Sequence, residues 1–237
     1  MARTAARATP AELAESLGMR LGSELRAGAL PVVTGIPPRR PVYPVLQALQ
    51  PLLPSGGLAG QIGVDVNHRG ATSLLCSLVA AATTAGLWCA VLDRPRLYPL
   101  AAVAAGVRLD RLALVDVPDI ESRLDALGIL CEGIPVVIAS TRGFTPRQLQ
   151  RASARAARSG TAVIWLEQQP VPRLDARIAV TACTWTGLRP NLGRLWGAGR
   201  LGTCRLRVTS TWRGGQRAIA ELWPYGRGSS MESDTRF

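Results

Sequence analysis

The sequence predicts an α/β fold whose mostly parallel central sheet continues into antiparallel C-terminal strands. From residue 45 to 166, short apolar segments typical of buried strands alternate with segments of helical periodicity. Glycine or proline stands at most of the junctions between them. After residue 176, strand-like segments follow one another without helices between them, which is typical of antiparallel pairing.

The first 44 residues are predicted to form an N-terminal helix and a proline-rich linker. Thr9-Pro10-Ala11-Glu12 has the form of a capping box with proline in the first turn, and it starts a helix over 9–28. Leucine recurs there every four residues, at Leu13, Leu17, Leu21 and Leu25. This leucine stripe either packs on its own domain or forms a protein interface. Prolines spread over 31–44 favour a stiff linker.

Residues 45–225 are predicted to form the α/β core, and 226–237 a disordered tail. Thr145 and Gly160 are expected to cap the helix between them. The predicted helices are 45–53, 72–85, 97–106, 119–131 and 146–159. The predicted strands are 61–66, 87–93, 112–116, 134–139, 161–166, 177–185, 203–211 and 217–223.

Composition and charge narrow the class of protein. The 237 residues carry 28 arginines and no lysine, against 16 acidic residues, for a net charge of +12. This surplus fits polyanion binding, and it equally fits a GC-rich genome that replaces lysine by arginine. The 47% hydrophobic content is enough for a packed core.

The cysteines and the apolar segments indicate a cytoplasmic protein. Five widely spaced cysteines without a CxxC pair, and a single histidine, predict reduced core thiols and no metal site. The N-terminus lacks the apolar core of a signal peptide. The longest apolar stretch, 74–92, is interrupted by polar residues and glycine, so we expect a buried helix and strand and no membrane association.

Residues 61–93 are laid out like a phosphate-binding loop between a strand and a helix. A working loop reads G-x-x-x-x-G-K-[ST], and its lysine reaches the phosphates. Here Asp65 occupies the first glycine position and Ala71 the lysine position. We call residues 65–73 the phosphate-loop remnant. Gly70, Ala71, Thr72 and Ser73 open the helix, where they either bind an anion weakly or only turn the chain.

The order of these elements resembles the core of the RecA ATPases over roughly 45–228. The segments that carry the resemblance are 58–62, 90–93, 105–112, 135–140, 205–208 and 225–228. The family's catalytic positions align with Ala71 for the lysine, Pro95 for the glutamate and Ala139 for the Walker B aspartate. Because hydrolysis needs phosphate charge neutralised and a water oriented, the resemblance implies a core without catalytic residues or cofactor.

Among RecA-like proteins, this short, arginine-rich chain is most similar to the ImuA′ family of actinobacteria, also over 185–188 and 220–223. That resemblance implies a non-catalytic adaptor in damage-induced, error-prone translesion DNA synthesis. Its expected partner is an ImuB-like Y-family polymerase homologue, in the cytoplasm or at the nucleoid. Self-association and weak DNA binding are further expectations. The alternative is a SulA-like inhibitor of cell division that binds a cytoskeletal GTPase.

Two other groups of residues are candidates for contacts. Arg147, Arg151, Arg155 and Arg158 share one helix face. This arginine stripe fits DNA phosphates, an acidic partner or a solvated surface; no aromatic is interleaved, which counts against a dedicated single-strand site. Trp88 and Trp165 are expected in buried strands, whereas Trp212 and Trp223 are candidates for a protein interface.

The polar residues at the predicted strand ends have two interpretations each. His68 and Arg69 contact an anion or are solvated loop residues. Asp93 binds a cation or caps the helix that follows it. Gln168 and Gln169 lie where RecA-like proteins place a phosphate-sensing glutamine, and without hydrolysis we expect them to be loop residues.

Overall fold

The computed structural model describes residues 40–93, 97–117, 119–187, 189–190, 199–200 and 203–226. Four predictions lie outside these residues: the helix at 9–28 with its leucine stripe, most of the linker, Pro95, and the tail beyond Gly226.

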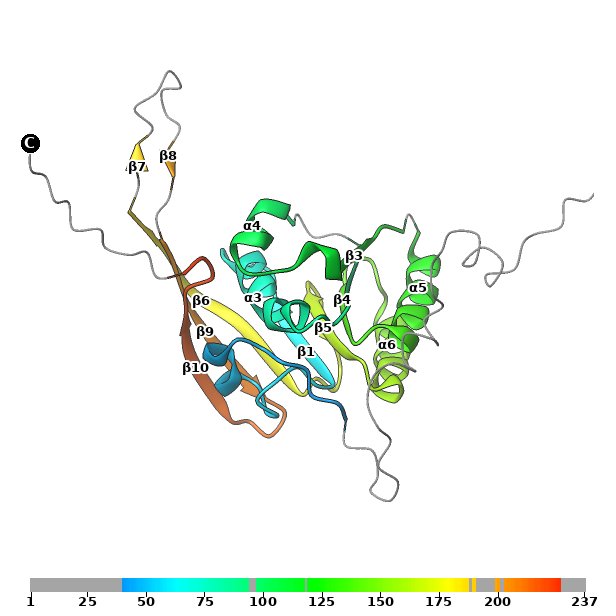
Figure 1. Cartoon of the computed structure of the whole chain (residues 1–237). Helices are drawn as coiled ribbons and strands as arrows, with labels where there is room; N and C mark the ends of the chain where they lie inside the picture. The colour runs from blue at the N-terminus through cyan, green and yellow to red at the C-terminus, as the bar shows by residue number, and fades with distance from the viewer. Residues whose placement is uncertain are drawn as a thin grey trace, which may run out of the picture.

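The centre of the fold is an eight-stranded sheet in the order β10-β9-β6-β1-β5-β4-β2-β3 (Figure 1). Strands β1 to β6 pair in parallel, β9 runs antiparallel to β6, and β10 antiparallel to β9. The predicted mostly parallel sheet with antiparallel C-terminal strands is therefore confirmed. The strands are β1 Gln61–Asp65, β2 Cys89–Leu92, β3 Leu112–Val115, β4 Val136–Ser140, β5 Ala162–Glu167, β6 Ala176–Thr186, β9 Thr203–Trp212 and β10 Arg217–Leu222. A separate pair joins β7 Arg189–Pro190 to β8 Gly199–Arg200.

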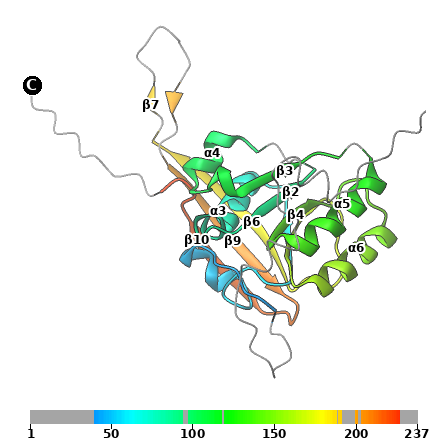
Figure 2. The same ribbon diagram turned by 45° about the vertical axis from the view of Figure 1, so that its right-hand side comes forward.

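Helices lie on both faces of the parallel part of the sheet (Figures 1 and 2). On one face, α3 packs on the sheet around Leu74, and the 3-10 helix η1 continues the same cluster with Leu49 beside the antiparallel strands β9 and β10. On the other, α5 and α6 pack around Leu149 and Trp165. The helical elements are η1 Gln47–Leu52, α3 Ala71–Thr84, α4 Pro99–Ala104, η2 Leu109–Arg111, α5 Ile120–Gly133 and α6 Pro146–Ser159.

Local sequence explains where α6 begins and ends. The Thr145 hydroxyl accepts from the Gln148 amide, and the Gln148 side chain accepts in return from the Thr145 amide. Pro146 opens the helix and Gly160 closes it in the left-handed conformation, at φ 76°. The capping box bonds backbone amides that the start of a helix leaves without partners, and proline there has no amide to satisfy. Glycine adopts the left-handed conformation that ends the helix. The predicted bounds, 146–159, are confirmed.

Two predictions about residues 45–93 differ in detail from the structure. The helix expected at 45–53 is the shorter 3-10 helix η1, which contains Pro51. Proline lacks the amide hydrogen that an α-helix requires at that position. Trp88 lies before β2 rather than in it, and it is only partly buried, with the Arg111 guanidinium 5.5 Å from its ring centroid. A cation over an aromatic face is favourable at such a half-exposed site.

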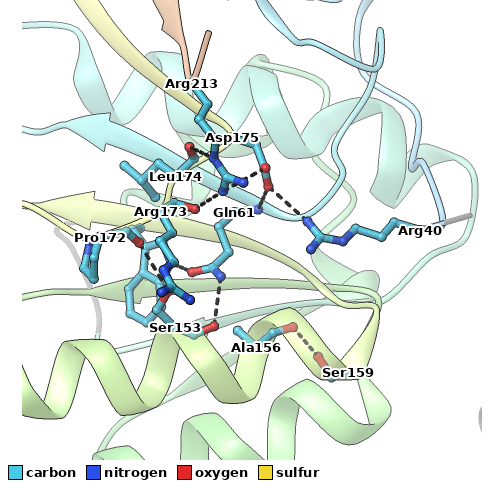
Figure 3. A network of polar contacts seen from close by, with 11 residues as sticks. Arg40, Gln61, Ser153, Ala156, Ser159, Pro172, Arg173, Leu174, Asp175 and Arg213 are labelled. Atoms are coloured by element: carbon cyan, nitrogen blue, oxygen red, sulfur yellow. Dashed lines mark hydrogen bonds and ion pairs between the residues drawn. The ribbon is translucent and has the colours of Figure 1, made fainter.

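Polar contacts at the amino ends of β1 and β6 connect distant segments (Figure 3). Asp175 accepts from the Gln61 amide at 2.9 Å, and it lies 3.4 Å from Arg40 and 3.1 Å from Arg213. The Gln61 side chain continues inward: its amide donates to the Ser153 carbonyl, and its oxygen accepts from the fully buried Trp165 indole at 3.0 Å. Buried polar groups need such partners, so this network fixes α6 against β1.

Candidate functional site

The phosphate-loop remnant connects β1 to α3 at the carboxyl edge of the sheet, where ligands bind in open α/β folds. Gly70 precedes α3 with φ 90°, and no described side chain caps the helix. A Cβ atom added there would lie 2.7 Å from Cδ2 of Leu206 on β9 and 3.3 Å from the Cys183 sulfur on β6. Glycine is required here by backbone conformation and packing, with or without a phosphate.

A carboxylate organises the turn where a phosphate-binding loop has its first glycine. The Asp65 side chain accepts from both the backbone amide and the side-chain amide of Asn67, each at 2.9 Å. His68 lies 3.6 Å away, and its contact with Asp65 counts as an ion pair only when the imidazole is protonated. A backbone amide that would face an anion in a phosphate-binding loop is therefore bonded to a carboxylate. A negative charge at this point opposes phosphate binding.

The helix start faces a small cavity of uncharged character. Its volume is about 330 Å³, and its lining is Thr72, Ser73, Cys76, Tyr98, Ala101 and Tyr225. The Ser73 hydroxyl lies 2.8 Å from the Tyr225 hydroxyl. Burial raises the pKa of Tyr225, and the bond to Ser73 partly opposes that rise. Among the described residues, the lining contains no arginine that could neutralise a triphosphate.

Of the three positions that the resemblance to RecA aligns with catalytic residues, the two within the described residues hold buried alanines. Ala71 and Ala139 are both in the core. Asp93, at the end of β2, makes an ion pair with Arg123 of α5 at 2.9 Å, and Arg123 also donates to the Arg142 carbonyl. Sequence reasoning left Asp93 as a cation ligand or a helix cap, and the structure adds a third role, a link between β2 and α5.

The segment after β5 is held by a buried threonine. The Thr141 hydroxyl accepts from the amides of Gln168 and Gln169, at 2.9 and 3.1 Å, and donates to the Leu166 carbonyl. The two glutamines follow the last residue of β5, so their placement in a loop is confirmed.

Sequence reasoning missed a charged pair at the same edge of the sheet. Glu167, 8% exposed, accepts from Nε and Nη2 of Arg177 at 2.7 and 3.0 Å, and from the Val171 amide at 3.0 Å. This bidentate bond raises the pKa of Arg177. Glu167 is paired with Asp65 in the β1–β5 register, so it borders the remnant. The available signal was a glutamate directly after an apolar strand.

The arginine stripe lies on the exposed face of α6, as the spacing predicts. Arg155 makes an ion pair with Glu132 of α5 at 3.1 Å. For Arg147, Arg151 and Arg158, the described residues provide no ion-pair partner within 4 Å. These three side chains are available to an external anion.

The tryptophans divide between core and surface. Trp165 is fully buried, as predicted. Trp212 is partly buried, and its indole donates to the Leu52 carbonyl at 3.0 Å, which ties β9 to η1; Trp223 is also partly buried. Among the described tryptophans, Trp185 is the exposed one, at 42%, and it stacks on Tyr225 with 5.7 Å between ring centroids. Whether Trp212 or Trp223 contacts a partner stays a prediction.

Comparison with known proteins places the chain in a family. The family model described as MT3502 N-terminal domain matches residues 51–173, more than half of the chain. The chain belongs to the MT3502 N-terminal domain family. A relative from Mycobacterium tuberculosis (strain ATCC 25618 / H37Rv), named "Uncharacterized protein Rv3395c", is 32% identical over 160 residues, covering 62% of this chain and 75% of that protein. The family match includes the remnant and the arginine stripe and ends before β6.

Two features are absent from the part of the chain that the structure describes. None of the helices in that part of the chain has the length and apolar character needed to cross a membrane. Within the same residues, histidine, cysteine and acidic side chains form no group of three that could hold a metal.

Proposed function

We propose that the protein is a non-catalytic, RecA-like adaptor of the ImuA′ type that holds an ImuB-like polymerase homologue during error-prone DNA synthesis after damage. The proposal has three supports: the strand order β3-β2-β4-β5-β1-β6, the loop between β1 and α3, and the mycobacterial relative. The first two agree with the resemblance to RecA, and the third agrees with an actinobacterial family.

The observation that carries the non-catalytic part is the chemistry around the remnant. Asp65 is bonded to the loop's own backbone, Ala71 is buried, and the described residues that line the adjacent cavity are all uncharged. Phosphoryl transfer depends on cations around the phosphates and a base or a polar group that orients water. Because the described residues at this edge of the sheet lack those groups, we expect the protein to act by binding partners through its exposed surfaces.

The first test concerns nucleotide. We expect the purified protein to show no ATP turnover, with or without single-stranded DNA, in a phosphate-release assay. The double variant Asp65→Gly/Ala71→Lys restores the motif, and we expect it to bind Mg-ATP in calorimetry where the natural sequence does not. Wild-type turnover that disappears in Thr72→Val would overturn the non-catalytic assignment.

The second test concerns the partner. The full chain is co-expressed with the ImuB-like protein of its own genome and, separately, with that genome's division GTPase, and each mixture is analysed by size exclusion at micromolar concentration. Co-elution with the ImuB-like protein supports the proposal. Co-elution with the GTPase instead would replace it by the SulA-like alternative, and binding to neither would refute both.

The third test asks whether the leucine stripe contributes to binding. Deletion of residues 1–30 removes Leu13, Leu17, Leu21 and Leu25 and leaves every described element in place. We expect the circular dichroism spectrum to lose only the ellipticity of the helix predicted at 9–28, the core to keep its cooperative thermal unfolding, and association with the ImuB-like protein to weaken. If association is unchanged, the stripe is not the contact, and the exposed surfaces of the core are the next to test.

A further inference from the structure

Two thiols lie close together across β6 and β9, beside the phosphate-loop remnant. The Cys183 and Cys204 sulfur atoms are 4.0 Å apart. The register places Cys183 opposite Leu206 and Cys204 opposite Trp185, so the two cysteines are diagonal neighbours on the same face of the sheet. A disulfide needs its sulfurs at about 2.05 Å, so a closure of only about 2 Å separates the free thiols from a bond.

The surroundings suit oxidation of this pair better than of the other cysteines. Cys183 is partly exposed, so a small oxidant can reach it, whereas Cys204 is buried behind it. Burial and the neighbouring Cys183 raise the pKa of Cys204 to about 12. Because the thiolate is the nucleophile, Cys183 is the thiol that attacks the oxidant first. Cys76, Cys89 and Cys131 are all buried, and no sulfur contact brings any two of them together within the described chain.

The strands also have room to adjust. β6 contains a register shift between Val180 and Ala182, directly before Cys183, and such an irregularity lets a strand bend locally. The Cys183 sulfur and Leu206 both pack against Gly70, so movement here reaches the start of α3. Beyond the thiols, the two strands lead to the β7–β8 pair, which Figure 1 shows projecting from the body of the protein.

We infer that Cys183 and Cys204 form a reversible regulatory disulfide that fixes the base of the β7–β8 projection and acts on the start of α3. This inference goes beyond the proposed adaptor role and does not depend on it. The oxidant is a low-molecular-weight disulfide. The Cys183 thiolate attacks one of its sulfurs, forming a mixed disulfide and releasing one small thiol. Cys204 then attacks the Cys183 sulfur, loses its proton and releases the second small thiol. Both cysteines are oxidised, and one small disulfide is reduced to two thiols.

The test treats the purified full chain with oxidised glutathione under native conditions, blocks remaining thiols by alkylation, and analyses the digest by mass spectrometry. Because the chain has no lysine, trypsin cuts only after arginine, and it does not cut before Pro190. We expect peptides 178–194 and 201–205 to be joined, and dithiothreitol to separate them. The intact protein should lose two hydrogens and two alkylation sites.

Matched variants distinguish the pair from general thiol oxidation. In Cys204→Ala, the mixed disulfide with glutathione should accumulate on Cys183, because the second thiol is absent. In Cys76→Ala, the joined peptides should persist. Circular dichroism before treatment confirms that each variant is folded. A stable glutathione adduct on the wild-type chain, cross-links spread equally over other cysteines, or a bond that forms only in urea would each overturn the inference.

Discussion

The parallel half of the sheet, β1 to β5, and the antiparallel half, β6, β9 and β10, differ in how far other elements cover their faces. In the parallel half, β2, β4 and β5 are buried along their whole length, because helices cover both faces. In the antiparallel half, β9 alternates between buried and exposed residues, and the described elements cover only the face toward η1 and α3. The family match covers the first half and stops before the second. The parallel half thus lies within the family match, whereas β9 and β10 carry exposed charged residues outside it.

The largest expected effect contrasts a buried with an exposed tryptophan. Trp165→Ala leaves a cavity in the parallel half and removes the donor to Gln61, so we expect unfolding in urea to need about 3–5 kcal/mol less free energy. Trp185→Ala in the antiparallel half removes an exposed ring stacked on Tyr225, so the loss should be about 1 kcal/mol. Equal losses would contradict the difference between the halves.

The next effect tests the junction between the halves. Gly70→Ala adds a Cβ at φ 90° and 2.7 Å from Leu206, so we expect a loss of about 2–3 kcal/mol from backbone strain and overpacking. Gly215→Ala has a similar φ of 82° with open space around it, so its loss should be about 1 kcal/mol. Both free energies come from urea titrations at one pH. If the two costs match, packing against β9 adds nothing at Gly70.

A smaller effect separates a buried from an exposed ion pair. Glu167→Ala leaves the Val171 amide without its acceptor and Arg177 without its partner, so we expect a loss of about 2 kcal/mol. Arg177 is 50% exposed, and the water it regains limits the cost. Glu221→Ala breaks a 4.0 Å exposed contact with Arg205 and should cost about 0.5 kcal/mol or less. Glu167→Gln, which keeps one acceptor, should fall between them.

Much of the fold could be predicted because its signals are local. Thr145, Gln148 and Gly160 fix the ends of α6 within a few residues of sequence, and β5 is a continuous apolar run between breakers. The η1 helix was less predictable, since Pro51 allows a helical turn but prevents an α-helix. Trp88 was wrongly expected to lie buried in a strand, because its exposure depends on the residue that covers it, Arg111 of η2, which is distant in sequence.

The site was harder to predict because its contacts cross the sheet. Asp65 and Ala71 already predicted a loop poorly suited to phosphate, since a phosphate-binding loop has glycine and lysine at those positions. The pairing of Asp93 with Arg123, of Glu167 with Arg177 and of Cys183 with Cys204 depends on strand order and register, which one sequence does not specify. A charge or thiol at a strand end is visible in the sequence, but its partner is not.

The smallest expected effect on stability comes from replacing exposed arginines. These replacements also compare the binding functions of the two halves. Arg147 and Arg151 lie on α6, which packs on the parallel half, and Arg207 and Arg217 lie on β9 and β10 in the antiparallel half; all four are exposed. The double variants Arg147→Ala/Arg151→Ala and Arg207→Ala/Arg217→Ala each remove two positive charges, so each controls for the other's change in net charge. Each substitution should change the free energy of unfolding by about 0.5 kcal/mol or less.

Binding to single-stranded DNA is then measured by fluorescence anisotropy at several salt concentrations. If the arginine stripe contacts phosphates, the α6 variant alone should weaken binding, and the slope of log affinity against log salt should fall by about one unit per lost contact. Equal weakening in both variants would indicate attraction to net charge rather than a site on α6. If the wild-type protein does not bind DNA, the stripe does not contact DNA. The same two variants, tested for binding to the ImuB-like protein, would then show which half of the sheet binds that partner.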